Sequence, residues 1–281
     1  MVIKFSAGAR RSPLSYLAGA CLIALSSLPA SAAPCGRDAG GFGAWLEDFK
    51  AEAAGKGISR ATLASALDGV TYDRKVIGFD RGQRSFKLSF EQFYAKRVSN
   101  AMIAKGRRLI ETHGATLSRI EQRYGVPAPV LIAIWGLETG YGRDGAGGFS
   151  ILRSLATLAY DCRRSEFFRN ELLAALTIVE RGDKTPAQLR GGWAGEIGQT
   201  QFLASSYVKY AVDFDGDGRR DLVRSIPDIL ASTANYLKAK GWQRGQDWHA
   251  GTANYGVIRE WNKAEVYVKT IAVMADKIKG S

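Results

Sequence analysis

One acidic side chain follows directly on an almost wholly apolar stretch of the sequence. Residues 126–137 carry no charge, and Glu138 comes next. At helical spacing this stretch is apolar on nearly every face, which predicts a helix that is buried all round and carries Glu138 at its end. Burial raises the pKa of a carboxyl group, as a general acid near neutral pH requires. The pattern is equally typical of a buried glutamate paired with an arginine, so on its own it leaves both roles open.

A second group of chemically suited residues lies in the glycine-rich segment 191–202. Glycines at 191, 192, 195 and 198 predict a loop whose backbone approaches a ligand closely. Trp193 and Phe202 offer flat apolar faces that can stack on sugar rings, and Gln201 offers a paired donor and acceptor for hydroxyl or acetamido groups. The alternative is a glycine-rich turn before an amphipathic helix, with Phe202 in the core.

The segment 213–228 opens with the D-x-D-x-D-G spacing of a calcium-binding loop. Arg224 stands at the twelfth position, where a bidentate glutamate is expected, so a closing carboxylate must come from further along. Three acids within five residues repel one another without a cation, which favours a structural Ca²⁺ that braces the adjoining helix. No cofactor is expected for catalysis. The expected ligands are Asp213, Asp215, Asp217, the main-chain carbonyl of Arg219, Asp221 and Asp228.

Helices must position most of these residues. Phe42, Trp45 and Phe49 recur at helical spacing, and Ser59 is placed to cap a helix at 60–67. Residues 70–88 alternate loosely around Gly82, which predicts an irregular connection. Further helices are expected within 89–124, broken near Gly106 and Gly114, and at 127–139, 164–181, 199–211, 227–240 and 261–279.

Strand signals are few, and the fold class that follows is mainly α with minor β structure. Residues 242–255, bounded by glycines, are the best candidate for a short hairpin. No segment repeats with a period of 20–50 residues, which excludes a solenoid. We therefore expect one catalytic unit over residues 33–281, which includes the acidic loop.

The composition excludes several functional classes. The chain has 46% hydrophobic and 23% charged residues, which is typical of a globular protein and not of a disordered, collagenous or coiled-coil one. With two histidines and no C-x-x-C it lacks the usual zinc motifs, and it has no G-x-S-x-G or phosphate-binding glycine loop.

Residues 1–32 have the three parts of a secretory signal peptide. Lys4, Arg10 and Arg11 precede a mostly apolar run that ends in Ala30-Ser31-Ala32. A lipid anchor on Cys21 is not expected, because Ala18 stands where its signal needs a leucine. We expect an exported, periplasmic protein whose net charge falls from +12 to +9 on cleavage. Such a charge would suit nucleic acid, but export favours an anionic extracytoplasmic polymer instead.

Two cysteines remain after the leader. In an oxidising compartment Cys35 and Cys162 are candidates for a disulfide, and two unpaired thiols are the alternative.

Several ordered motifs together resemble a known family. They are W-G-L-E-T-G-Y-G at 135–142, Y-D-x-R-R at 160–164, G-x-x-G-Q-T-Q-F at 195–202, Y-A-V-D-F-D-G-D-G at 210–218 and A-N-Y-L at 234–237. In these motifs the sequence resembles the lytic murein transglycosylases of the B type, over nearly all of the chain beyond the leader.

The resemblance implies a lysozyme-like catalytic core with a helical domain and a small accessory domain. It implies non-hydrolytic cleavage of the β-1,4 bond between N-acetylmuramic acid and N-acetylglucosamine in peptidoglycan, which leaves a 1,6-anhydro-muramoyl end. Glu138 matches the family's single catalytic acid/base. Gly192 and Glu196 depart from the family's usual serine and small residue. Residues that match or resemble its glycan-binding positions are Phe93, Arg163, Arg164, Gln201, Trp261, Asn262 and Tyr267, to which Trp193 is added as a stacking surface.

Two other functions remain open from the sequence. The first is a hydrolytic muramidase in which Glu196 activates water, and the second is a non-catalytic murein-binding scaffold in which Glu138 is structural. In each case the expected partner is the peptidoglycan glycan strand and not nucleic acid. We expect a monomer that can join complexes of cell-wall enzymes.

Overall fold

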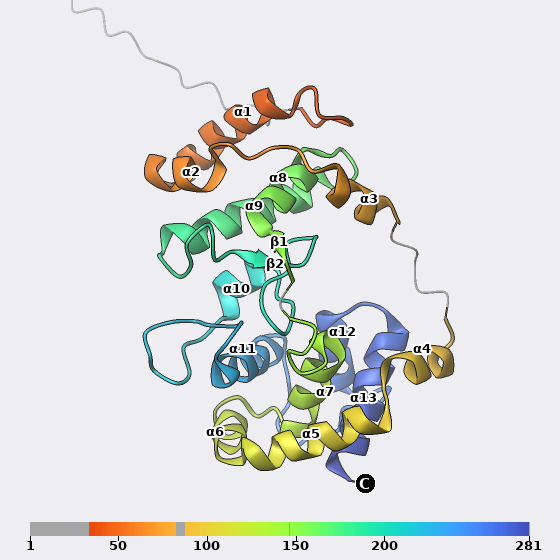
Figure 1. The fold of residues 1–281 in the computed structure, drawn as a ribbon. Helices are drawn as coiled ribbons and strands as arrows, with labels where there is room; N and C mark the ends of the chain where they lie inside the picture. Colours follow the sequence, from red (N-terminus) through yellow and green to blue (C-terminus); the bar gives the residue numbers. More distant parts are fainter. Residues whose placement is uncertain (1–33, 83–87, 146, 281) are drawn as a thin grey trace, which may run out of the picture. The chain divides into compact units, whose positions relative to one another are not determined.

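Thirteen helices carry nearly all the regular structure of the described residues, which are 34–82, 88–145 and 147–280 of the computed structural model (Figure 1). These residues belong to one structural unit that runs from Ala32 to Ser281. The predicted mainly α class with minor β structure is confirmed. The proposed signal peptide, residues 1–32, lies outside the described residues.

One group of helices is built around α8 (Ile151–Tyr160) and α9 (Ser165–Glu180), which pack along each other. Helices α1 (Phe42–Gly55) and α2 (Arg60–Leu67) pack against them, and α3 (Arg74–Gly82) packs on α8. Ser59 caps α2 as predicted, since its hydroxyl accepts a hydrogen bond from the Thr62 N–H. The rings of Phe42, Trp45 and Phe49 are buried in this group.

The second group surrounds α7 (Ala128–Thr139), in which nine of the twelve residues are buried. The predicted helix, buried all round, is therefore present. The helices that complete this group are α4 (Phe90–Arg97), α5 (Asn100–Thr112), α6 (Gly114–Tyr124), α11 (Ile226–Ala239), α12 (Ala253–Trp261) and α13 (Glu265–Lys279).

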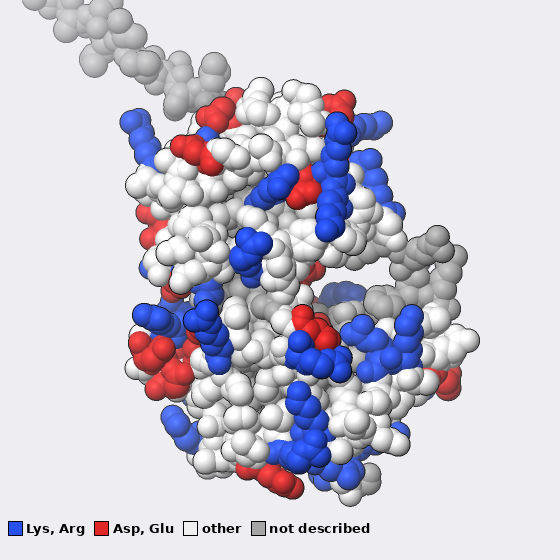
Figure 2. Space-filling model, viewed as in Figure 1, with Lys and Arg blue, Asp and Glu red and all other residues white. Residues whose placement is uncertain are grey.

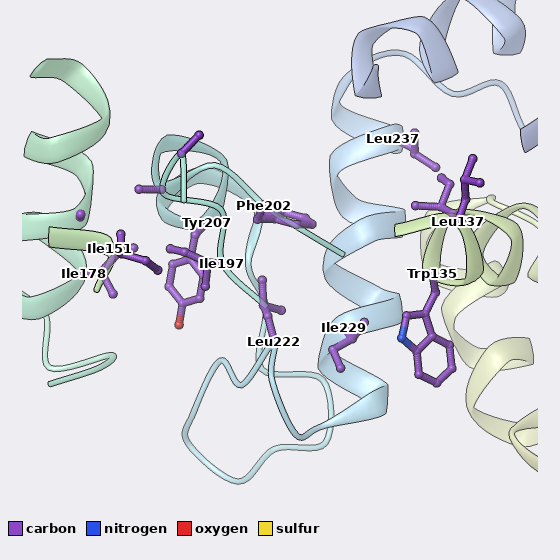
Figure 3. Packing of buried hydrophobic residues seen from close by; sticks show 14 of the residues in the cluster. Trp135, Leu137, Ile151, Ile178, Ile197, Phe202, Tyr207, Leu222, Ile229 and Leu237 are labelled. Carbon is purple, nitrogen blue, oxygen red and sulfur yellow. The ribbon is translucent and has the colours of Figure 1, made fainter. Parts of the chain in front are cut away.

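A short helix and a two-stranded sheet join the groups. Helix α10 (Ala204–Tyr210) contacts both α9 and α11, and β1 (Phe149–Ser150) pairs antiparallel with β2 (Arg190–Gly191). Figure 3 shows the continuous core here, with Ile197, Phe202 and Leu222 between α9 and α11 and with Trp135 of α7 beyond Ile229.

The disulfide between Cys35 and Cys162 ties the start of the described chain to the turn between α8 and α9. Backbone hydrogen bonds reinforce it, since the Gly36 N–H donates to Tyr160 O and the Cys162 N–H to Gly36 O. Among the helices that the structure describes, none combines the length and apolar composition that a membrane crossing needs.

Four expectations about the elements are wrong. The segment 70–88 contains α3, and Gly106 lies inside the unbroken helix α5. The segment 242–255 forms no hairpin, because irregular turns lead directly into α12. The helix expected at 199–211 starts only at Ala204. In addition, α8 is a buried helix that the periodicity did not single out.

Candidate active site

Glu138 lies near the C-terminal end of α7, and two neighbouring helices hold one of its oxygens. The Trp261 Nε1–H donates to Oε1 over 2.8 Å, and the Tyr267 hydroxyl donates to the same oxygen over 2.5 Å. The other oxygen, Oε2, makes no hydrogen bond within the described residues, and Glu138 lines a pocket. No arginine of the described residues forms an ion pair with Glu138, as a purely structural glutamate would require. The carboxyl group is therefore oriented by hydrogen bonds and not by a salt bridge.

The surroundings favour the protonated form of this carboxyl group. Burial raises the pKa of Glu138, and the hydrogen bonds from Tyr267 and Trp261 offset the shift only in part. The charge of Arg97 lowers the pKa as well, whereas that of Glu196 raises it. The Arg97 guanidinium donates to the carbonyl of Leu137, the residue that precedes Glu138. The net direction is upward, as general acid catalysis requires.

Gln199 fixes the C-terminal end of α7 through hydrogen bonds. Its Oε1 accepts from Trp135 Nε1–H over 2.8 Å, its Nε2 donates to Val223 O, and its carbonyl accepts from the Thr139 hydroxyl. A Cβ on Gly142 would stand 2.2 Å from Gln199 Oε1, and φ of Gly142 is +76°. The glycine after the helix is therefore needed so that the chain can turn over this side chain.

The pocket beside Glu138 has a volume of about 360 Å³. Polar and aromatic groups both line it, as suits a ligand with hydroxyl groups and apolar ring faces. It is lined by Glu138, Glu196, Gln201, Phe202, Leu203, Ser206, Tyr236, Glu260, Trp261 and Asn262.

Four of the residues expected to bind glycan lie at this site. Gln201, Trp261 and Asn262 line the pocket, and Tyr267 contacts Glu138 directly. Gln201 is held with φ of +54°, a conformation that non-glycine residues rarely adopt, and its Nε2 donates to Gly198 O. Phe93 is buried and packs against the Tyr267 ring with centroids 6.3 Å apart, so it supports the ring whose hydroxyl binds Glu138.

The other three expected residues do not line the pocket. Arg163 and Arg164 both bind the carboxylate of Asp80 on α3, which is only 2% exposed. These guanidinium groups hold the pKa of Asp80 below its ordinary value although burial works against them. Trp193 stacks on Phe79, with ring centroids 6.2 Å apart.

The glycines of the 191–202 loop pack closely against the protein in the direction where a Cβ would stand. A Cβ at any of the four would come within 2.4 Å of another atom of the chain. The nearest atoms are Glu196 O for residue 191, Glu196 Oε2 for 192, Leu155 Cδ2 for 195 and Leu222 O for 198.

Three acids of the acidic loop converge. Oxygens of Asp213, Asp215 and Asp217 lie within 4.8 Å of one another, a hard-oxygen set that suits Ca²⁺. Figure 2 shows red atoms gathered at the left edge, where Figure 1 draws the loop between α10 and α11.

The two more distant acids of this loop are used elsewhere. Both oxygens of Asp228 accept backbone N–H groups, from Phe214 and Asp221, so Asp228 braces the loop from inside. Asp221 pairs with Lys184 at 3.3 Å.

Sequence reasoning missed Arg97 and Gln199 and gave no role to Tyr236. Arg97 lies 40 residues from Leu137, whose carbonyl it binds, and no local pattern links the two. Gln199 lies 64 residues from Trp135, but it stands in the G-x-x-G-Q-T-Q-F motif, which could have pointed to it. Tyr236 lies in the A-N-Y-L motif, which was a usable signal, and its hydroxyl donates to Glu260 O at the pocket wall.

Known proteins resemble this chain in sequence and structure. It is 44% identical over 130 residues to membrane-bound lytic murein transglycosylase B of Escherichia coli K12, a match that spans 46% of this chain and 36% of that protein's length. The structure of SltB3 from Pseudomonas aeruginosa in complex with NAG-NAM-pentapeptide superposes with a TM-score of 0.79 at 33% identity, covering 85% of this chain and 80% of SltB3.

A further structure and a family model agree with these matches. The Escherichia coli lytic transglycosylase Slt35 in complex with calcium gives a TM-score of 0.74 at 25% identity over 83% of this chain and 92% of Slt35. The model described as the transglycosylase SLT domain matches residues 41–252. This match covers most of the sequence, and the chain belongs to the transglycosylase SLT domain family.

Proposed function

We propose that this protein is a lytic murein transglycosylase that cleaves the β-1,4 bond between N-acetylmuramic acid and N-acetylglucosamine without water. The observation that carries the proposal is Glu138, a carboxyl group with a raised pKa, fixed through one oxygen at the edge of a pocket. The related SltB3 has been crystallised with NAG-NAM-pentapeptide and with NAG-anhNAM-pentapeptide, a substrate-like and a product-like fragment of this reaction.

Glu138 performs both proton transfers in this mechanism. The neutral acid donates its proton to the glycosidic oxygen while the bond from that oxygen to C1 of the muramic acid breaks through an oxocarbenium-like state. The substrate's acetamido oxygen stabilises C1. The C6 hydroxyl of the same sugar then attacks C1, and its proton returns to the Glu138 carboxylate. An attack within one sugar competes with water because its effective molarity is high.

The remaining residues at the site bind and orient. Trp261 and the half-buried Tyr236 provide aromatic surface, and the side chains of Gln201 and Asn262 supply amide groups for hydroxyl and acetamido groups. The basic net charge suits peptidoglycan, whose peptide stems carry carboxylates. Arg163 and Arg164 are partly exposed beyond their pairing with Asp80, and we propose that they face such stems.

A structural Ca²⁺ in the acidic loop and a periplasmic location belong to the same proposal. The convergence of Asp213, Asp215 and Asp217 supports the ion, and Slt35 was crystallised with calcium. The disulfide between Cys35 and Cys162 supports an oxidising compartment.

The test is product analysis with a matched pair of variants. Purified murein treated with the wild-type protein releases muropeptides that end in 1,6-anhydro-muramic acid. Glu138→Gln keeps the shape of the side chain but has no proton to give, so turnover falls about 10²-fold or more. Glu47→Gln makes the same change on an exposed side chain of α1 and keeps wild-type turnover.

The alternatives predict other results. Reducing ends in place of anhydro ends would identify a hydrolytic muramidase, which the presence of Glu196 in the pocket keeps as the second candidate. Undiminished turnover in Glu138→Gln would show that Glu138 is structural.

A further inference from the structure

The pocket contains a second carboxyl group with no role in the mechanism above. Glu196 lines the same pocket as Glu138. Its Oε2 accepts the Ala194 N–H over 3.1 Å, and its own backbone carbonyl accepts the Gly192 N–H over 2.9 Å. The side chain is therefore folded back over the turn 192–196 in a defined position.

The residue at 192 decides whether this position is available. A Cβ at 192 would stand 2.2 Å from Glu196 Oε2 and 3.0 Å from its Cδ. The φ angle of Gly192 is outside the left-handed region, so its backbone conformation would accept another residue. What excludes a side chain is the carboxyl group of Glu196. Gly192 and Glu196 are thus a matched pair, in which the glycine leaves open the space that the carboxyl group fills.

No basic side chain of the described residues forms an ion pair with Glu196. The charge of Arg164 lowers the pKa of Glu196, but the Arg164 guanidinium already binds Asp80. Glu138 is faced by Tyr267 of α13, Trp261 of α12 and Arg97 of α4, and Glu260 at the pocket rim pairs with Lys263.

From this arrangement we infer that Glu196 is a positioning residue for the acid/base, a second carboxyl group in the same pocket that, once ionised, keeps the proton on Glu138 until the glycosidic oxygen takes it. The inference rests on the proposed function. Two carboxyl groups that share a poorly solvated pocket do not ionise independently, and the first to lose its proton holds the proton of the other more tightly. Burial raises the pKa of both groups, and the charge of Glu196 adds to the shift at Glu138.

The decisive variant is Glu196→Gln. The amide keeps the size of the side chain and an oxygen for the Ala194 N–H, and it removes only the charge. We measure kcat/KM against pH on purified soluble glycan strands, because that profile reports the ionisation of the free enzyme. In this profile, kcat/KM falls on the basic side where Glu138 loses its proton, and we expect that fall to move to lower pH by about half a unit or more. The maximum kcat/KM stays within about threefold of the wild-type value.

A second variant moves the carboxyl group without removing it. In Gly192→Ala the new methyl group displaces Glu196 Oε2, so the basic limb moves in the same direction. In the double variant Gly192→Ala/Glu196→Gln the shift equals that of Glu196→Gln alone, since no charge is left to displace. Glu47→Gln serves as the control and keeps the wild-type profile.

Two results would overturn the inference. One is a Glu196→Gln profile that superimposes on the wild type, as a purely structural brace of the turn predicts. The other is an equal loss of rate at every pH, which would mean a contact with substrate. Failure of the proposed function is a separate outcome, since it would appear as the absence of anhydro ends in the products of the wild-type protein.

Discussion

The two oxygens of Glu138 have different surroundings, and this division is the basis of the residue-scale account. Trp261 and Tyr267 both donate to Oε1, so the carboxyl group cannot rotate freely, while Oε2 is left for the pocket. Both donors stabilise the carboxylate and so lower the pKa of Glu138, but burial raises it by more. Orientation and a raised pKa are therefore supplied by different neighbours, and mutation can separate them.

Tyr267→Phe tests this separation. The loss of a donor that favours the carboxylate raises the pKa of Glu138 further, so the basic limb of kcat/KM against pH moves to higher pH. The carboxyl group is also held less firmly, and we expect kcat/KM at the optimum to fall about tenfold. Tyr255→Phe removes a similar tyrosine–glutamate bond, to Glu265, away from the pocket, and it leaves the profile in place. A limb that moves to lower pH would contradict the assignment.

Single-residue roles were predictable from the sequence where a motif carried them. Glu138, Gln201, Trp261 and Tyr267 were all named in advance, and the structure brings them together. The pairing of Arg163 and Arg164 with Asp80 was not predictable, because it joins segments 83 and 84 residues apart through a helix that the sequence did not indicate.

At the scale of elements, the loop between α10 and α11 is braced from inside by Asp228. That carboxylate accepts two backbone N–H groups of the loop and is fully buried at the first turn of α11. Three further carboxylates, of Asp213, Asp215 and Asp217, gather at the exposed side, where like charges oppose one another.

Calcium should therefore stabilise the fold without entering the chemistry. A cation that binds only the folded chain adds about 2.7 kcal/mol at one hundred times its dissociation constant. We expect the melting temperature to rise with CaCl₂ and to fall again with EDTA, while turnover well below the melting temperature changes little. Asp215→Asn loses most of the rise, and Asp48→Asn, on an exposed residue of α1, keeps it. Equal melting temperatures in calcium and EDTA would contradict this assignment.

Elements were predictable where a local signal was strong, such as the Ser59 cap for α2 and the uninterrupted apolar stretch for α7. Helix α3 was missed because its buried face is only Val76, Ile77 and Asp80, and because Asp80 is stabilised there by distant arginines. Gly106 does not break α5, since the Tyr141 hydroxyl packs where a Cβ would stand, 2.6 Å away. In both helices the conformation depends on tertiary contacts with distant residues, which no local sequence pattern reveals.

At the scale of the whole molecule, the account depends on segments that are far apart in the sequence. Glu138 is held by side chains 123 and 129 residues further along, and the disulfide closes a separation of 127 residues. The sequence motifs predicted that these segments belong to one site. The physical reason that they meet is the shared core around α7 and α11, which only the folded chain shows (Figure 3).

The most direct test of the central claim is to run the reaction of the wild-type protein on purified murein in H₂¹⁸O and to weigh the released muropeptides. If Glu138 acts alone and the sugar's own C6 hydroxyl attacks C1, the products carry anhydro ends and no ¹⁸O from the solvent at the cleaved bond. One ¹⁸O at each new muramic acid end would mean that water is the nucleophile, and it would contradict the account.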